Sequence, residues 1–439
     1  MSEGRPDRLI SLDVFRGITI AGMVLVNNPG TSPTYWPLDH AEWNGLTPTD
    51  WIFPFFLFIV GVSIAISLGK AKETSEKGYG KILRRTVVIY LLGASVSILP
   101  FFQFQATDAP DILKLAVWLV FCASLFFLLL RKFLIAGVLC GIGLIGIAGM
   151  NLAGYNVVGY DYGTLRIAGV LQRIAVCYLV TAIIFLHTTW KQQIWISSAI
   201  LLAYWAAMTL IPVPGCEVTS LSDKACNLAA YLDRLILTEN HIWRYGKVYD
   251  PEGILSTLPA IVSTIAGVLA GTWLLKRRDD EGDESGTFSA SYEKAAGMFF
   301  FGAVLLAMGL IWNSWFPMNK ALWTSSYVFA TTGLALTFLG CCYWLIDLNG
   351  IRRWAWAFEV FGANAIALFV FSGFFARMMN GYRVADGEKT ISLHGWVMKN
   401  IFLPIAQPID ASWMYAVSFI LFWLFLMWLL YRRRIYIKV

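Results

Sequence analysis

The amino-acid sequence predicts an all-α fold, a polytopic membrane helix bundle of about twelve transmembrane helices. The 439 residues are 58% hydrophobic and only 14% charged, whereas soluble domains carry about 25% charged residues. The apolar residues gather in runs of roughly 20, the length that a helix needs to cross the hydrocarbon core. The basic residues lie in short clusters between these runs, so the net charge of +6 indicates a membrane topology and no nucleic-acid partner.

The apolar runs are expected to be helices, because lipid offers no hydrogen-bond partner to an unpaired backbone. The first run is the weakest, since Arg16 lies near its start, and no cleavable signal peptide is expected before it. The expected spans are 14–29, 52–69, 84–103, 113–130, 133–152, 167–187, 193–212, 254–275, 295–313, 323–346, 356–377 and 413–431.

The loops between the spans alternate in positive charge. Basic clusters precede the first span and follow the even-numbered spans: Arg5 and Arg8, Lys70 to Arg85, Arg131 and Lys132, Lys191, Lys276 to Arg278, Arg352 and Arg353, and Arg432 to Arg434. The loop 30–51 contains neither Lys nor Arg. The positive-inside rule therefore predicts cytoplasmic N and C termini and places this loop outside.

We expect residues 1–439 to form a single transmembrane domain, with a polar segment at 277–294 as a flexible cytoplasmic linker inside it. Five of the seven cysteines lie within spans, where Cys is usually a small apolar filler. The other two, Cys216 and Cys226, share the longest outside loop. An oxidising compartment allows them to pair, so we predict a disulfide.

One of the four histidines, His40, directly precedes the second span, with Asp39, Glu42 and Asp50 nearby in "YWPLDHAEWNGLTPTDWIFPFFLF". An imidazole, with an ordinary pKa near 6.5, can accept a proton at neutral pH, and a carboxylate can orient its ring. A satisfied interfacial histidine is the alternative interpretation. No second His or Cys lies at ligand spacing, so no metal is expected.

The helix after His40 has a clear start signal. Thr47, Pro48 and Asp50 match the N-cap, first and third positions of a capping box. Capping alone is therefore an alternative role for Asp50. Asn44 and Gly45 form a turn signal directly before this cap.

Polar residues within or beside spans are rare and often functional. Asn27 ends the first span, and Arg166 and Arg173 lie seven residues apart on one helical face near the sixth. Asn364 lies in the eleventh span, where a helix–helix hydrogen bond is the alternative explanation. For Arg16, a local ion pair three residues from Asp13 is the alternative.

Six motifs in this sequence resemble, in the same order, the heparan-α-glucosaminide N-acetyltransferase family and its bacterial relatives. They run from Arg8 to about Val328 and read "RLISLDVFRGITIAGMVLVNN", "YWPLDHAEWNGLTPTDWIFPFFLFIVGVSI", "LRIAGVLQR", "AAYLDRLIL", "YDPEGILSTLPAI" and "PMNKALWTSSYV". The resemblance implies a transmembrane acetyltransferase that uses acetyl-CoA from the cytoplasmic side and acetylates an amino sugar on the far side.

The resemblance also implies roles for particular residues. His40 matches the catalytic histidine, and Asn27 matches its partner asparagine. The acceptor site is expected to comprise Asn44, Asp50, Asp250, Glu252, Asn319, Lys320 and Trp323. The acetyl-CoA site is expected to comprise Arg16, Arg166, Arg173 and Asn364. Direct transfer to the amine and an acetyl-histidine intermediate both remain open.

Two departures from the lysosomal enzyme shape the expected substrate. This chain is expected to lack the extra luminal domain and leading helix, and it has two additional spans at 113–130 and 133–152. Free glucosamine or a cell-wall amino sugar is therefore the expected acceptor. The expected location is a bacterial inner membrane, with the acceptor site on the periplasmic side, and a homodimer is compatible with the sequence. A sugar or peptidoglycan-fragment transporter is the alternative function, since about twelve spans with polar midplane residues suit one too.

Overall fold

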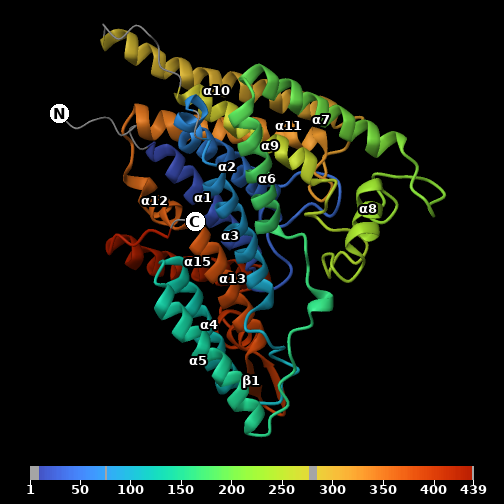
Figure 1. Cartoon of the computed structure of the whole chain (residues 1–439), viewed down its shortest axis with the longest axis vertical. Helices are drawn as coiled ribbons and strands as arrows, with labels where there is room; N and C mark the ends of the chain where they lie inside the picture. Colours follow the sequence, from blue (N-terminus) through green and yellow to red (C-terminus); the bar gives the residue numbers. More distant parts are fainter. Residues whose placement is uncertain (1–8, 75–76, 276–283, 438–439) are drawn as a thin grey trace. The chain divides into compact units, whose positions relative to one another are not determined.

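The computed structural model describes residues 9–74, 77–275 and 284–437 (Figure 1). The long helices are α1 (Ile10–Asn27), α2 (Pro48–Glu73), α3 (Tyr79–Ile98), α4 (Asp111–Leu129), α5 (Phe133–Leu152), α6 (Val170–His187), α7 (Trp190–Leu210), α9 (Thr257–Leu275), α10 (Glu284–Trp312), α11 (Ser325–Cys342), α13 (Ala365–Gly381) and α15 (Pro408–Arg432). The shorter elements are α8 (Leu228–Leu237), α12 (Trp356–Ala363), α14 (Leu393–Val397), and the antiparallel strands β1 (Arg383–Asp386) and β2 (Lys389–Ser392). The prediction of an all-α membrane bundle is confirmed.

Ten of the described helices are long and apolar enough to span a membrane, and the bent pair of α12 and α13 makes an eleventh if it counts as one span. The remaining expected span, 84–103, overlaps α3, which is not among the helices apolar enough to span a membrane. That helix carries Lys81, Arg84 and Arg85 within its first turns, which makes it more polar than the others. The described part of the expected linker, 284–294, is the start of α10, whereas residues 276–283 lie outside the described residues.

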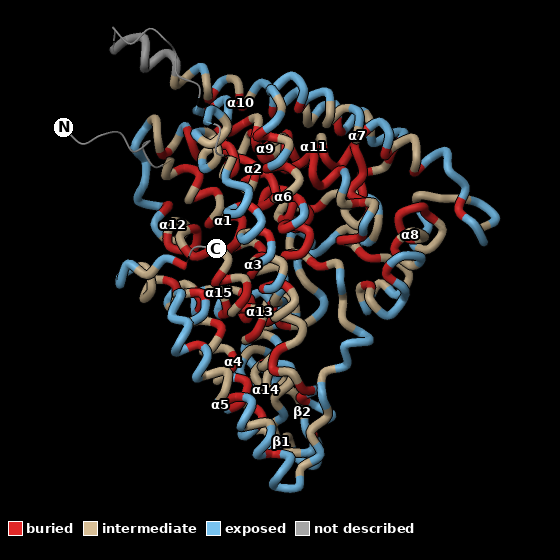
Figure 2. Tube along the Cα trace, in the orientation of Figure 1, coloured by how far each residue is buried: buried red, intermediate tan, exposed pale blue. Residues whose placement is uncertain are grey.

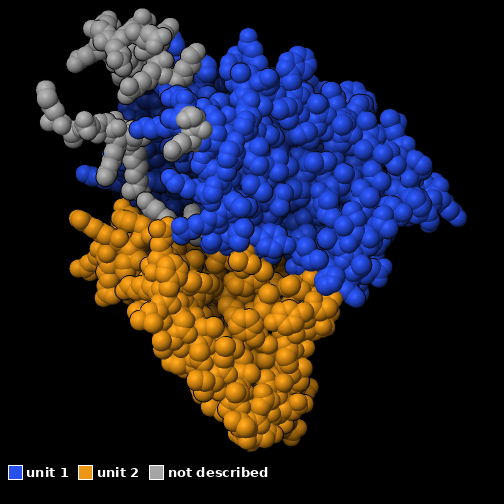
Figure 3. Space-filling model, in the orientation of Figure 1, with its two compact units in different colours: residues 1–23, 39–90, 166–362 blue, residues 24–38, 91–165, 363–439 orange. Residues whose placement is uncertain are grey.

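The chain divides into two compact units (Figure 3). Unit 1 contains residues 1–23, 39–90 and 166–362, and unit 2 contains residues 24–38, 91–165 and 363–439. Every predicted site residue except Asn27 and Asn364 belongs to unit 1.

Unit 1 is built on α2, α6, α9 and α11, which pack on one another and are its most buried helices (Figure 2). Glycines allow α2 and α9 to touch backbone to backbone. A Cβ atom at Gly61 of α2 would lie 1.9 Å from the Thr264 carbonyl oxygen, and one at Gly267 of α9 would lie 1.9 Å from the Phe58 carbonyl oxygen. Small residues are the usual means of close helix approach in membranes, where water does not drive association.

Unit 2 contains the α4–α5 hairpin, the small β1–β2 sheet, and helices α13, α14 and α15. Asn364 lies at the 74° break between α12 and α13. Its amide nitrogen donates to the Ile435 carbonyl at 3.0 Å, and its amide oxygen accepts from the Ile437 N–H at 2.7 Å. Within this unit, the side chain of Asn364 therefore holds the backbone that follows α15.

The contact of Gly61 with α9 predicts that an added methyl group destabilises the protein at this glycine but not at an open one. Gly61→Ala should lower the thermal unfolding midpoint of the detergent-purified protein, because the new Cβ meets a main-chain oxygen that cannot move aside. Gly137→Ala in α5 is the matched control, because a Cβ there meets nothing within 4 Å. Equal midpoints for the two variants would contradict the packing of α2 against α9.

Candidate active site

The centre of the site is an imidazole–carboxylate pair at the first turn of α2. His40 Nδ1 lies 2.7 Å from Asp50 Oδ1. The His40 side chain is 48% exposed, whereas that of Asp50 is 1% exposed. One partner therefore faces outward while the other is fixed inside the protein. Neither Asp39 nor Glu42 takes this place: Asp39 accepts the backbone N–H of His40, and Glu42 is exposed.

Asp50 holds its position through the helix cap. Its Oδ2 accepts the backbone N–H groups of Ala41 and Thr47, each at 3.1 Å, and lies 3.0 Å from Thr47 Oγ1. The predicted start of α2 at Thr47 and Pro48 is therefore present. Asp50 serves both as capping residue and as partner of His40, which the sequence left as alternatives.

A proline four residues later ties the same aspartate to α11. Pro54 has no N–H, so the main-chain carbonyl of Asp50 lacks its helical donor. The Tyr327 hydroxyl donates to that carbonyl at 2.6 Å. The start of α2 is thereby anchored to α11 at the residue that holds His40.

A turn between α10 and α11 closes over the His40 loop. Asn319 is fully buried, and its amide nitrogen donates to Asn44 Oδ1 at 3.1 Å. The Gly45 N–H donates to the Met318 carbonyl at 2.8 Å. Gly45 has φ of +127°, a conformation that favours glycine, as the Asn–Gly turn signal indicated.

Lys320 follows Asn319 and reaches the imidazole. Its Nζ lies 3.0 Å from Nδ1 and 3.3 Å from Nε2 of His40, and 3.6 Å from Asp50 Oδ1. Burial lowers the pKa of the Lys320 ammonium, although the carboxylates of Asp50 and Glu252 oppose this shift. The site thus contains a cation, an imidazole and a carboxylate in mutual contact.

A second charged cluster lies in the same unit. Arg166 Nε donates to Asp250 Oδ2 at 2.9 Å, and Nη2 donates to Asp250 and to Glu252. Burial disfavours the charged guanidinium, but Glu252 and Asp250 outweigh it and raise the pKa of Arg166. Both carboxylates are buried, so this pairing meets the requirement that buried charges have partners.

Arg173, only 2% exposed, lies on α6 near this cluster. Its Nη2 donates to the Gly253 carbonyl and to Ser256 Oγ, and its guanidinium stacks 5.1 Å from the Trp323 ring centre. Trp323 has φ of +52°, and its Nε1 donates to Ser263 Oγ at 3.1 Å. Among the residues that the structure describes, Nε and Nη1 of Arg173 have no hydrogen-bond partner.

The loop with the predicted disulfide packs on the His40 loop. Cys216 and Cys226 are bonded, with Cα atoms 5.8 Å apart. Trp43 Nε1 donates to the Leu221 carbonyl at 2.9 Å, and Asn44 Nδ2 donates to Ser222 Oγ at 3.3 Å. The disulfide-bonded loop therefore supports the loop that carries His40.

The remaining predicted residues have local partners. Arg16 donates to Asp13 Oδ1 at 3.0 Å and to Ser63 Oγ of α2 at 3.1 Å, so the ion pair is present. Asn27 ends α1 and is exposed. It belongs to unit 2, as does Asn364, so the pairing of Asn27 with His40 stays a prediction.

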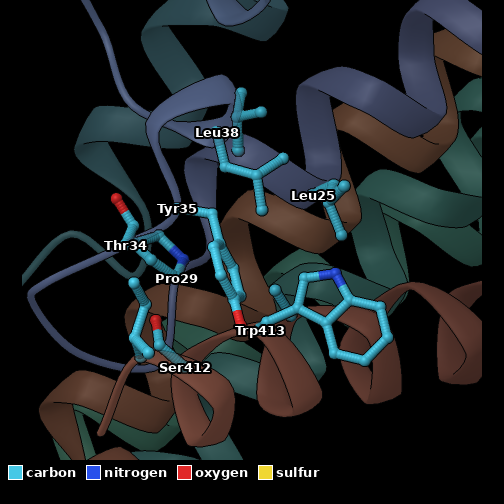
Figure 4. A pocket seen from close by; sticks show the side chains of 10 residues that line it. Leu25, Pro29, Thr34, Tyr35, Leu38, Ser412 and Trp413 are labelled. Carbon is cyan, nitrogen blue, oxygen red and sulfur yellow. The ribbon is translucent and has the colours of Figure 1, made fainter.

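Unit 2 also has a small apolar pocket (Figure 4). Leu25, Leu38 and Trp413 line it, and Tyr35, another lining residue, donates its hydroxyl hydrogen to Asp410. Its lining contains none of the predicted site residues. The polar chemistry of the candidate site therefore lies in unit 1.

Two residues that support the site, Tyr327 and Asp233, lie in the quoted sequence motifs, but the motifs did not indicate their roles. Tyr327 lies in "PMNKALWTSSYV", and the missing N–H of Pro54 is the signal that predicts a donor for the Asp50 carbonyl. Asp233 lies in "AAYLDRLIL" and is buried. Its carboxylate accepts the N–H groups of Ile254, at 2.9 Å, and Asp250, at 3.4 Å. No local sequence pattern predicts those long-range contacts.

The fold and the site together define a multi-pass membrane protein with a polar site at the ends of its spanning helices. The family model of the heparan-alpha-glucosaminide N-acetyltransferase catalytic domain matches residues 8–280. The human heparan-alpha-glucosaminide N-acetyltransferase is 28% identical over 416 residues, covering 83% of this chain and 52% of the human protein. The mouse heparan-alpha-glucosaminide N-acetyltransferase is 26% identical over 415 residues, covering 83% and 53%.

The chain therefore belongs to the heparan-alpha-glucosaminide N-acetyltransferase family. The matched segment 8–280 includes His40, Asp50, Arg166, Arg173 and the "YDPEG" motif, whereas Asn319 and Lys320 lie beyond it. The chain spans about half the length of these two curated relatives.

Asp233 predicts a pH dependence of stability. Burial raises the pKa of Asp233 to about 6, against about 4 in an unfolded chain. The folded state therefore binds the Asp233 proton more tightly than the unfolded chain does. The stability that this protonation contributes is lost as the pH rises from 4 to 6. The loss is on the order of 3 kcal/mol. Between pH 4 and 7, the thermal midpoint of Asp233→Asn should rise relative to that of the wild type.

Asp223 is the matched control, because the N–H groups of Cys226 and Ala225 lower its pKa. Its contribution to stability is present above pH 4 and is lost only below that pH, so between pH 4 and 7 the Asp223→Asn midpoint should run parallel to that of the wild type. Parallel curves for wild type and Asp233→Asn would contradict the buried carboxylate.

Proposed function

We propose that this protein is a transmembrane acetyltransferase that moves an acetyl group from cytoplasmic acetyl-CoA to the amine of a glucosamine-type sugar. The observation that carries the proposal is the exposed His40 ring held by buried Asp50. Family membership supports the acetyl-transfer chemistry. The proposed location is a bacterial inner membrane, with the acceptor site on the periplasmic side.

The pair suits proton removal from an amine. An ionised carboxylate can only accept hydrogen bonds, so its contact with Nδ1 favours the tautomer that carries the proton there. Nε2 then carries the lone pair, 3.3 Å from Lys320 Nζ. An acceptor amine at neutral pH is mostly ammonium, which cannot attack a carbonyl, so His40 Nε2 would take its proton before or during attack.

The amine nitrogen then forms a bond to the acetyl carbon, the C–S bond breaks, and the CoA thiolate leaves and is protonated. Asn27 would donate to the thioester oxygen, where negative charge develops, or orient His40. Transfer through an acetyl group on His40 is the rival order of steps. Both orders need the same ring with its Nε2 lone pair available.

The surroundings suit a cationic acceptor. Asp39 and Glu42 are exposed beside His40, and the loop 30–51 contains no basic residue, so this loop offsets the Lys320 cation and attracts an ammonium group. Asn44 also belongs to this rim, and its amide already contacts the Asn319 turn. We assign hydroxyl recognition on the sugar to the exposed amide of Asn44.

The donor nucleotide is proposed to bind at the opposite, cytoplasmic ends of the spans. Arg16 is the preferred phosphate contact, with Lys81, Arg84 and Arg85 of α3 as further cations. Arg16 already binds Asp13 and Ser63, which would fix its guanidinium for a bidentate contact. The thioester would reach His40 from that side without CoA crossing the membrane.

The test is the release of free CoA thiol by the purified protein with labelled acetyl-CoA and a panel of amino sugars. Wild type should release more than one thiol per protein molecule only when an acceptor amine is present, and it should then yield the N-acetyl sugar. His40→Ala should fold, still bind acetyl-CoA, and lose transfer by about 10²-fold or more, because a positioned base contributes about 10²–10⁴-fold.

His187→Ala is the matched control: that exposed histidine ends α6 and contacts the Tyr79 hydroxyl at 2.6 Å. Near-normal turnover in a folded His40→Ala protein would remove His40 from the mechanism. Transport of an amino sugar without any thiol release would instead identify a permease.

A further inference from the structure

The ε-amine of Lys320 occupies an unusual place beside the proposed base. Its Nζ lies 3.0 Å and 3.3 Å from the two ring nitrogens of His40. The proposed function requires a primary amine at that same ring. Lys320 is therefore a primary amine of the protein itself, positioned where an acceptor amine must be deprotonated.

The backbone next to Lys320 is fixed, whereas its side chain is partly exposed. Asn319 is held by Asn44, and its Oδ1 also accepts the Leu322 N–H at 2.9 Å. The Lys320 side chain is 24% exposed, and its four-carbon stem carries a compact amine with rotatable donors. The amine can therefore turn toward a thioester beside His40 without any change in the fold.

The charges around Lys320 act in both directions. Burial lowers the pKa of the Lys320 ammonium, whereas the carboxylates of Asp50 and Glu252 oppose that shift. The His40 ring is in direct contact with the same nitrogen. The net shift is downward, so the neutral amine is more abundant than in an exposed lysine. A neutral amine is the form that attacks a carbonyl.

We propose that Lys320 is a self-acetylation site, modified by the protein's own acetyl-transfer chemistry when donor is present and acceptor is absent. This inference rests on the proposed function. The Lys320 nitrogen bonds to the acetyl carbon, the C–S bond breaks, and the thiolate leaves with the electron pair. The proton lost by the amine passes to His40 Nε2 and then to the thiolate, so the products are acetyl-lysine and CoA.

Acetylation of Lys320 has a direct consequence for the site. The amide nitrogen carries no charge, so the contact with the Asp50 carboxylate loses its electrostatic basis. The acetamide would also lie against the His40 ring, in the place of the acceptor. Because an amide is a poor acyl donor, the modification does not reverse by transfer to a sugar, and the site is closed.

The experiment incubates the purified full-length protein with labelled acetyl-CoA, with and without amino sugar, and maps acetyl-lysine by peptide mass spectrometry. Lys224 is the internal control, because it is an exposed lysine that stacks on Trp43 in the neighbouring loop. Without acceptor, Lys320 should be labelled at least about ten-fold more than Lys224, because it is held at the base. An accepted amino sugar should suppress this label.

Two variants separate enzymatic from chemical acetylation. His40→Ala, checked for folding by gel filtration, should lose the Lys320 label by about 10²-fold. Lys320→Arg keeps the charge but offers no amine. After preincubation with acetyl-CoA, wild type should lose turnover progressively, and Lys320→Arg should keep whatever turnover it starts with.

Each outcome decides a claim. Equal labelling of Lys320 and Lys224, or full Lys320 labelling in His40→Ala, would overturn the proposal. Thiol release with an amino sugar but an unlabelled Lys320 would overturn it and leave the proposed function standing. His40-dependent labelling of Lys320 with no amino sugar turned over would support self-acetylation and remove the assigned acceptor.

Discussion

The carboxylate of Asp50 is the group on which the rest of the site depends. A buried charge is costly unless hydrogen bonds and charges compensate it. Asp50 receives this compensation from two backbone N–H groups, from Thr47 Oγ1, from His40 and from Lys320. The same residue offers its main-chain carbonyl to Tyr327. The helix cap, the His40 loop and α11 therefore meet at one side chain.

The partly exposed Arg166 follows the same rule with different partners, whereas buried Arg173 follows it only through Nη2 and its ring contact. Arg166 pairs with Asp250 and Glu252, and Arg173 is shared between backbone, serine and the Trp323 face. These groups lie outside or at the ends of spans, whereas the middle of α2 and α9 is joined through Gly61 and Gly267. The close packing of the spans thus holds the helices together, and the polar side chains of the site lie at the helix ends.

Sequence reasoning recovered what is encoded locally. The spans follow from hydropathy, and the start of α2 follows from Thr47, Pro48 and Asp50, because a cap involves residues within one turn. The sequence could not choose among Asp39, Glu42 and Asp50 as partner of His40. That choice depends on how the loop folds back around Gly45, which a one-dimensional pattern does not contain.

Contacts between distant segments were the least predictable. Lys320 contacts His40, which lies 280 residues away in the sequence. The family resemblance placed Lys320 in the acceptor site but did not predict its contact with His40. Asp233 binds the backbone around Gly253, although its motif gives no periodic or capping signal. The expected helix α3 is present, but the charges in its first turns leave it less apolar than the helices that qualify as spans. The local sequence predicts the helices and their starts, whereas the contacts between distant residues depend on the packing of the whole unit.

The most direct test of the account is a double-mutant cycle on acetyl transfer between His40 and Asp50. The four proteins are wild type, His40→Ala, Asp50→Asn and the double variant, each checked for folding. If Asp50 acts through the His40 ring, removing the ring leaves it nothing to orient, and the double variant should be about as slow as His40→Ala. If the two losses in kcat/KM multiply, Asp50 acts independently of His40, and the central claim is wrong.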